Sequence, residues 1–157
     1  QGGLTVKLII LSDTHGLLRP QVIEHLQTAD AILHAGDINR PAILEQLRQY
    51  APLYVVRGNN DKEWAQELPH HLDFTLEGVR FYMVHNKKEL PADLSGVDVV
   101  VFGHSHQYLC QQREGLLWLN PGSCGPRRFH QPITLMAAQL QQGKIQVEKI
   151  EIPQEAR

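Results

Sequence analysis

The sequence predicts an α/β fold in which two mixed β-sheets are stacked on each other. Its first half alternates apolar runs of strand length with segments of helical periodicity, the signature of a parallel sheet with crossover helices. Its second half contains pairs of strand-like segments joined by dipeptides that end in glycine, and such pairs predict antiparallel strands. The length of 157 residues corresponds to about one domain, and no linker divides it. We therefore expect a single domain over residues 4–153.

The first half is predicted to hold three strands and two helices in alternation. Val6–Leu11 is an apolar run, so it predicts a strand buried on both faces. The two helices are predicted at Arg19–Gln27 and Pro41–Gln49, and a proline suits the first turn of the second helix. The other two strands are predicted at Ala31–Ala35 and Leu53–Val56.

The second half is predicted to consist mainly of strands. Glu77-Gly78, Glu114-Gly115 and Gln142-Gly143 supply the turns of three hairpins. The strands joined by these turns are Phe74–Leu76 with Arg80–Val84, Tyr108–Arg113 with Leu116–Leu119, and Ile133–Leu140 with Ile145–Ile152. Val97–Phe102 is a further apolar run and predicts one more buried strand.

Composition and charge exclude several classes of protein. The net charge of −2 gives no basic footprint of the kind that a dedicated nucleic-acid binder needs. No apolar run approaches the ~20 residues of a membrane-spanning helix and no signal peptide is recognised, so we expect a cytoplasmic protein. Residues 1–3 resemble an expression remnant. The 2 cysteines lack CxxC spacing, which argues against a disulfide framework or a structural zinc site.

Polar side chains follow five of the predicted strands, at the point where each strand ends. In chain order they are Asp13 and His15, Asp37, Asn59, His85, and His104 with His106. Sites in open α/β sheets form at the carboxyl ends of strands, so we expect these loops to converge on one crevice. Side chains two residues apart in an extended segment point the same way, so each D-x-H or H-x-H pair aims at one place. Gly36, Gly58 and Gly103 precede three of these positions and allow close approach of the backbone.

Seven oxygen and imidazole ligands are too many for one first-row metal ion but suit two ions that share a carboxylate. Two ions about 3.5–4 Å apart bind and polarise a phosphate and lower the pKa of a bridging water. Two aspartates against two divalent ions leave a charge of about +2, which attracts an anionic ester. The donor set suits Mn²⁺, which is our first expectation, and also Ni²⁺, Fe²⁺ or Zn²⁺.

Six short motifs occur in order between about Lys7 and Arg128. They are Asp13-x-His15, Gly36-Asp37, Gly58-Asn59-Asn60-Asp61, His85, Gly103-His104-Ser105-His106 and Asn120-Pro121-Gly122-Ser123. The set resembles the calcineurin-like metallophosphoesterase superfamily, in particular its small bacterial and archaeal phosphodiesterase branch, which the retromer subunit also resembles.

The resemblance implies a four-layer α-β-β-α fold and hydrolysis of a small phosphodiester by a metal-bridging hydroxide. It implies two sets of ligands with a shared aspartate, namely Asp13, His15, Asp37 and His106 for one ion, and Asp37, Asn59, His85 and His104 for the other. A phosphomonoesterase stays open as an alternative. So does a non-catalytic scaffold, because the retromer subunit serves as an interaction module. The sequence also leaves homo-oligomerisation open.

The sequence departs from the family at the leaving-group side of the site. Many members carry His or Cys after the metal-binding Asn, where this chain has Asn60. In members with His, an Asp three residues after the bridging Asp assists it, and that position is Arg40 here. No catalytic side chain is therefore assigned. Asn60 is a candidate either for contact with the substrate or for the N-cap of the following helix. His34 is expected to be a buried histidine of the core rather than a ligand.

Overall fold

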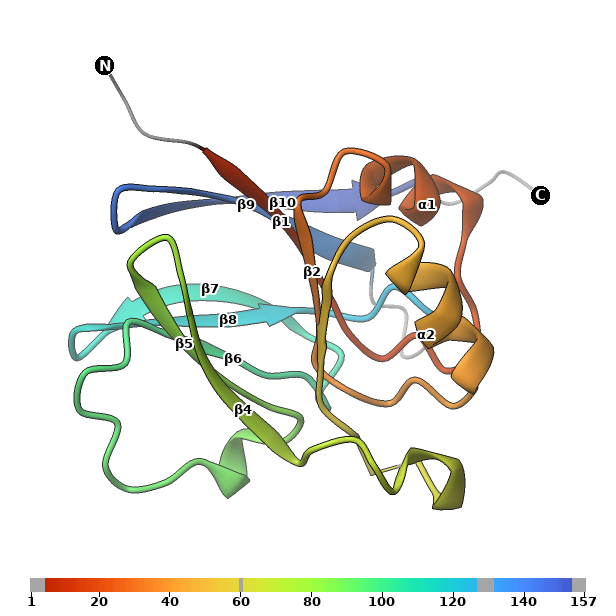
Figure 1. The fold of residues 1–157 in the computed structure, drawn as a ribbon, viewed down its shortest axis with the longest axis horizontal. Coiled ribbons are helices and arrows are strands. Elements are labelled where there is room, and N and C mark those ends of the chain that lie inside the picture. The colour runs from red at the N-terminus through yellow and green to blue at the C-terminus, as the bar shows by residue number, and fades with distance from the viewer. Residues whose placement is uncertain (1–4, 60, 127–131, 154–157) are drawn as a thin grey trace.

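The computed structural model describes residues 5–59, 61–126 and 132–153, and it contains two stacked five-stranded sheets (Figure 1). Sheet A has the strand order β10-β9-β1-β2-β3. Its strands are β1 (Val6–Leu11), β2 (Ala31–His34), β3 (Leu53–Val55), β9 (Ile133–Gln141) and β10 (Lys144–Ile152). The strands β1, β2 and β3 are parallel, whereas β9 runs antiparallel to both β1 and β10. Sheet A is therefore mixed, and two stacked mixed sheets with helices confirm the predicted fold class.

Sheet B is also mixed and has the strand order β4-β5-β6-β8-β7. Its strands are β4 (His71–Leu76), β5 (Val79–Val84), β6 (Val99–Val101), β7 (Tyr108–Arg113) and β8 (Leu116–Pro121). The central strands β5, β6 and β8 are parallel, and β4 and β7 run antiparallel at the two edges. All three predicted hairpins are present. Both central residues of each turn have positive φ, from Glu77 at 46° to Gly115 at 81°.

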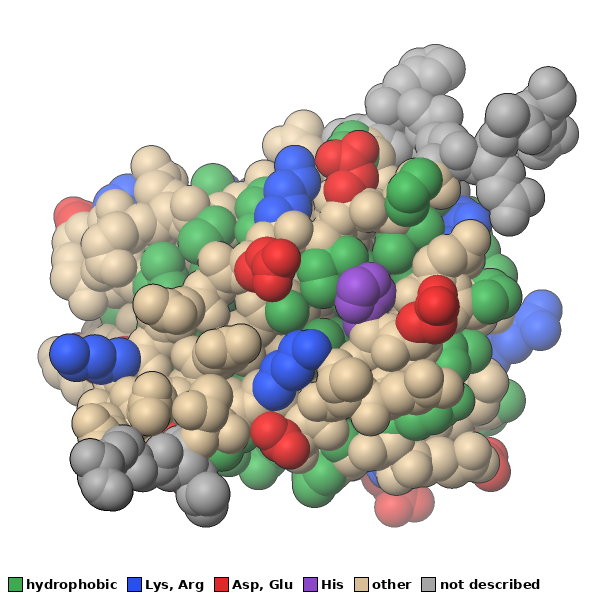
Figure 2. Space-filling model, turned by 90° about the horizontal axis from the view of Figure 1, so that it is seen from above, with side chains coloured by type: hydrophobic (Ala, Val, Ile, Leu, Met, Phe, Trp, Pro, Cys, Tyr) green, Lys and Arg blue, Asp and Glu red, His purple; other side chains and the backbone are tan. Residues whose placement is uncertain are grey.

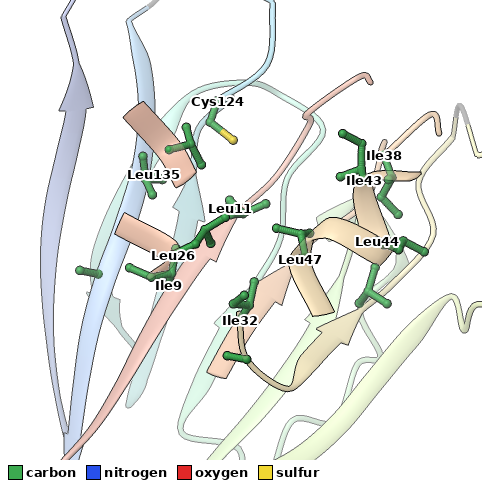
Figure 3. Packing of buried hydrophobic residues seen from close by; sticks show 14 of the residues in the cluster. Ile9, Leu11, Leu26, Ile32, Ile38, Ile43, Leu44, Leu47, Cys124 and Leu135 are labelled. Carbon is green, nitrogen blue, oxygen red and sulfur yellow. The ribbon is translucent and has the colours of Figure 1, made fainter. Parts of the chain in front are cut away.

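The helices α1 (Pro20–Leu26) and α2 (Pro41–Arg48) both start at a proline, whose fixed φ suits the first turn. They pack on the outer face of sheet A, where Leu26 and Leu47 meet Ile9 and Leu11 (Figure 3). The neighbouring β1 residues Leu8 and Ile10 point instead into the core between the sheets. The prediction that β1 is buried on both faces is therefore confirmed.

The outer face of sheet B is covered by the segment 86–97. This segment contains the short 3-10 helix η2 (Lys87–Glu89), and its Leu90 and Leu94 pack against Phe102 and other residues of sheet B. No α-helix in the described ranges covers this face, so the helical layer implied by the resemblance is reduced here to one 3-10 turn.

A second 3-10 helix, η1 (Glu63–Ala65), follows β3. It has Lys62 at its N-cap, two residues later than capping by Asn60 predicts. No helix within the described part of the chain is long and apolar enough to span a membrane. On the face shown in Figure 2, basic and acidic side chains are interspersed.

Candidate metal centre

Five of the seven predicted ligands come together in two overlapping groups. Asp13, His15 and His106 form one group, and Asp13, Asp37 and His85 form the other; within each group the candidate ligand atoms lie within 4.8 Å of one another. The residues follow β1, β2, β5 and β6, so the loops at the carboxyl ends of strands from both sheets converge as predicted.

Each of the two aspartates lies close to two imidazoles, and only Asp37 lies close to one from each group. Asp13 Oδ1 is 3.5 Å from His106 Nε2 and 3.8 Å from His15 Nε2. Asp37 Oδ2 is 3.2 Å from His85 Nε2 and 3.8 Å from His15 Nε2. Ligand atoms around one ion with bonds of about 2.0–2.2 Å stand about 3–3.5 Å apart, so small movements would suffice to bind a metal.

The other two predicted ligands are exposed at the rim. The His104 ring lies edge-on to the His85 ring, with 5.3 Å between their centroids. Asn59 is exposed on the loop after β3 and directly follows Gly58. The structure therefore places His104 beside His85 of the second group, whereas Asn59 lies on the neighbouring loop after β3.

The backbone of the site is left-handed rather than extended. Positive φ angles occur at Asp13 (56°), His15 (46°), Asp37 (59°), His104 (74°) and His106 (65°). Residues other than glycine rarely adopt such angles, and they cluster at functional sites when they do. The prediction of extended D-x-H and H-x-H segments is therefore wrong, because loop-to-loop hydrogen bonds bend the chain. One such bond runs from the His15 amide to the Asp37 carbonyl at 2.9 Å.

The three glycines beside the ligands provide space. A Cβ on Gly36 would lie 2.7 Å from His85 Nδ1, and one on Gly58 would overlap Asp37. A Cβ on Gly103 would come within 2.9 Å of Asp13 Oδ2. The prediction of close backbone approach is confirmed, because a side chain at any of these three positions would overlap a neighbouring residue of the site.

Hydrogen bonds determine which nitrogen of two buried histidines carries the proton. His85 Nδ1 donates to the Ala35 carbonyl at 2.7 Å, which leaves Nε2 facing Asp37. A ligating histidine is typically held in this way by its other nitrogen. His34 Nδ1 instead accepts from the Gly36 amide at 3.0 Å, so its Nε2–H donates to Thr14 Oγ1 at 3.1 Å. His34 is fully buried behind the site, as predicted, and burial lowers its pKa to about 3.

The pKa values of Asp13 and His85 are both raised in this centre. Burial raises the pKa of Asp13 to about 7, although the charge of His85 and a hydrogen bond from Ser12 act in the opposite direction. Burial also disfavours the charged form of His85, but the Asp37 and Asp13 carboxylates outweigh it and raise the pKa of His85. Asp13 Oδ1 is buried and accepts no hydrogen bond from any described residue. A buried carboxylate oxygen beside two imidazole nitrogens fits a divalent cation.

The Asn120-Pro121-Gly122-Ser123 turn braces the metal loops. The Asn120 amide donates to the Gly103 carbonyl at 3.2 Å, and the Ser123 hydroxyl donates to the Asp13 carbonyl at 3.1 Å. Gly122 has a φ of 76°. These residues therefore form a tight turn, closed by a hydrogen bond from the Gly122 amide to Asn120 Oδ1 at 2.9 Å, that holds the two metal loops together.

Two further residues named by the sequence pattern, Arg40 and Asp61, lie beside the metal loops. Arg40 is exposed and packs on Gly16, where an added Cβ would lie 3.1 Å from Arg40 Nε. Asn60 lies outside the described residues, so its predicted contact with substrate is untested. Asp61 follows Asn60, and no local pattern in the sequence indicates the hydrogen bonds that its buried carboxylate accepts from distant main-chain amides. A groove of about 810 Å³ lies on the outer face of sheet B, between the segment 86–97 and the residues 113–118, and not at the carboxylates.

The stacked mixed sheets and the convergent carboxylates and imidazoles define a protein of the metallophosphoesterase class. The sequence profile described as the calcineurin-like phosphoesterase superfamily domain matches residues 6–143. The chain therefore belongs to the calcineurin-like phosphoesterase superfamily.

Relatives and solved structures agree with this assignment. A probable metallophosphoesterase of Methanothermobacter thermautotrophicus is 30% identical over 141 residues, which cover 81% of this chain and 82% of that protein. Phosphodiesterase YfcE of Escherichia coli K12 is 32% identical over 146 residues, covering 75% of this chain and 79% of YfcE. The structure of Vps29 from Cryptosporidium parvum has a TM-score of 0.76 at 20% identity, covering 97% of this chain and all of Vps29. That likeness concerns the fold alone.

Proposed function

We propose that the chain is a dinuclear metal-dependent phosphodiesterase acting on small phosphodiesters. The observation that carries the proposal is the position of Asp37 Oδ2, 3.2 Å from His85 Nε2 and 3.8 Å from His15 Nε2. One carboxylate oxygen thus lies between imidazoles of both groups, where an oxygen shared by two ions is needed. Asp13 Oδ2, by contrast, already accepts hydrogen bonds from the Ser12 hydroxyl and the His104 amide.

The family to which the chain belongs suggests how the ligands divide between the two ions. Asp37 is the shared ligand, and Mn²⁺ is the first candidate metal. One ion would be held by Asp13, His15, Asp37 and His106, and the other would be held by Asp37, Asn59, His85 and His104. When bound, two such ions lower the pKa of a water between them and polarise the phosphoryl oxygen. The cytoplasmic location and the oligomeric state stay predictions.

The chain's own residues orient and balance this centre. The hydrogen bond to the Ala35 carbonyl keeps His85 Nε2 turned to the site. The two aspartates offset half the charge of two divalent ions, and the remaining charge of about +2 attracts an anionic ester. Arg40 adds a guanidinium on the Gly16 side of the site, where it can contact a phosphate oxygen.

The test is hydrolysis of an activated aryl phosphodiester and the matching monoester by chelator-treated protein. We expect Mn²⁺ or Ni²⁺ to restore hydrolysis, with the diester preferred. Asp37→Asn should abolish it, whereas the matched control Asp73→Asn should not, because Asp73 is an exposed partner of Arg80. A preference for the monoester would establish the phosphomonoesterase alternative, and failure to hydrolyse either ester with any metal would favour a scaffold.

A further inference from the structure

The buried carboxylate of Asp61 accepts hydrogen bonds from four main-chain amides. Asp61 is 1% exposed. Its Oδ2 accepts from the amides of Gly58 at 2.8 Å and Asp37 at 3.0 Å. Its Oδ1 accepts from the amides of Asn39 at 2.8 Å and Ile38 at 2.9 Å. One side chain therefore joins the loop after β2 to the loop after β3.

The loop after β2 has a backbone conformation that is suited to binding an anion. Asp37 and Asn39 have φ angles of 59° and 71°, and three successive amides from residue 37 to residue 39 point at the same carboxylate. Concave runs of amides in such conformations bind anions. Left-handed angles are unfavourable for residues other than glycine, and the hydrogen bonds that the Asp61 carboxylate accepts from these amides offset this strain.

The two loops that Asp61 joins carry Asp37 and Asn59. Gly58 packs directly on Asp37, since a Cβ there would overlap the Asp37 amide and carboxylate. The Asp13 side of the centre is held by other groups, namely the Ser12 hydroxyl and the His104 amide on Asp13 Oδ2. No hydrogen bond described for Asp61 reaches Asp13 or His106.

We infer that Asp61 is a positioning residue for one of the two ions, the one assigned to Asp37, Asn59, His85 and His104. The inference rests on the proposed dinuclear function. Loss of the Asp61 carboxylate leaves the Asp37 and Asn59 loops free to separate, while Asp13 keeps its hydrogen bonds from the Ser12 hydroxyl and the His104 amide. Removing Asp61 should therefore lower the affinity of the protein for the two ions unequally.

The test is calorimetric titration of chelator-treated protein with Mn²⁺. Asp61→Asn places an amide donor against main-chain donors, so we expect the second ion to bind 10- to 100-fold more weakly, the range typical of groups that support metal ligands. The first ion shares Asp37 but keeps Asp13, His15 and His106, so its affinity should fall by a smaller factor than that of the second ion. The matched control is Asp98→Asn, because exposed Asp98 also accepts from a main-chain amide, that of Arg80 at 2.9 Å.

Asp61→Glu keeps the charge and provides a rescue test should Asp61→Asn fail to fold. It should bind the second ion more tightly than Asp61→Asn but less tightly than wild type, again with a smaller effect on the first ion. Two ions bound by the variants as tightly as by wild type, or an equal loss of both ions, would overturn the inference while the proposed function stands. A wild-type protein that binds one ion only would overturn both.

Discussion

Replacing Gly122 with valine tests whether the turn after β8 supports the metal loops. A non-glycine residue at a φ of 76° costs about 1–2 kcal/mol. A side chain there would also overlap Thr134 Oγ1, which donates to the Pro121 carbonyl at 2.7 Å, and overpacking of this kind costs about 1–3 kcal/mol. The sum is about 2–5 kcal/mol of unfolding free energy. At about 2–4 °C per kcal/mol, the melting temperature should fall by about 4–20 °C.

The matched control is Gly115→Val in the β7–β8 turn. Gly115 has a similar φ of 81°, but nothing lies within 4 Å of an added Cβ, so only the backbone cost applies. Its melting temperature should fall by about 2–8 °C, with hydrolysis retained. The assays are thermal unfolding by circular dichroism and aryl phosphodiester hydrolysis with Mn²⁺. Gly122→Val with an unchanged melting temperature but no turnover would refute the reasoning and make the turn a substrate-binding element.

Two further predictions concern the leaving group and the response to acid. Because positions 60 and 40 hold Asn and Arg, we expect no residue of the recognised motif to protonate the leaving oxygen, so rates in a series of phosphodiesters should fall steeply as leaving-group pKa rises. Asn60→His should accelerate hydrolysis of esters with poor leaving groups more than of those with good ones, by less than the full ~10²–10⁴-fold of general-acid catalysis. A shallow dependence of the wild-type rate on leaving-group pKa would mean that another residue acts as the acid. Because the pKa of His34 is lowered to about 3 in the folded state, the unfolded state binds one more proton below its ordinary 6.5, and stability falls as pH falls from 6.5 towards 3. The unfolding free energy should fall by up to about 1.4 kcal/mol per pH unit in this range. His34→Gln should reduce the slope of unfolding free energy against pH by one proton, as measured by melting curves of chelator-treated protein. Equal slopes for the two proteins would contradict the lowered pKa of His34.

Much of the fold follows from local pattern. The apolar run Val6–Leu11 is a strand with core on both sides, since Leu8 and Ile9 face opposite clusters. Turn dipeptides such as Glu114-Gly115 adopt the positive φ angles that a two-residue hairpin needs. These features depend on neighbouring residues alone, so the sequence is enough to predict them.

Other features depend on contacts between distant segments. The left-handed angles at Asp13 and His15 arise because their loop bonds to the loop of Asp37, and no pattern within Asp13-x-His15 reports that. Asp61 reads locally as part of a helix cap, yet its carboxylate binds amides up to 24 residues away. The replacement of a helical layer on sheet B by the segment 86–97 likewise depends on packing rather than periodicity.

The number of metal ions needed for activity tests the central claim most directly. Chelator-treated protein would be titrated with Mn²⁺ while hydrolysis of an aryl phosphodiester and bound metal per chain are both measured. We predict that activity saturates at two ions per chain and that Asp37→Asn, which removes the carboxylate beside both His15 and His85, binds fewer than two ions. Saturation at one ion per chain, or full activity in excess chelator, would contradict the account.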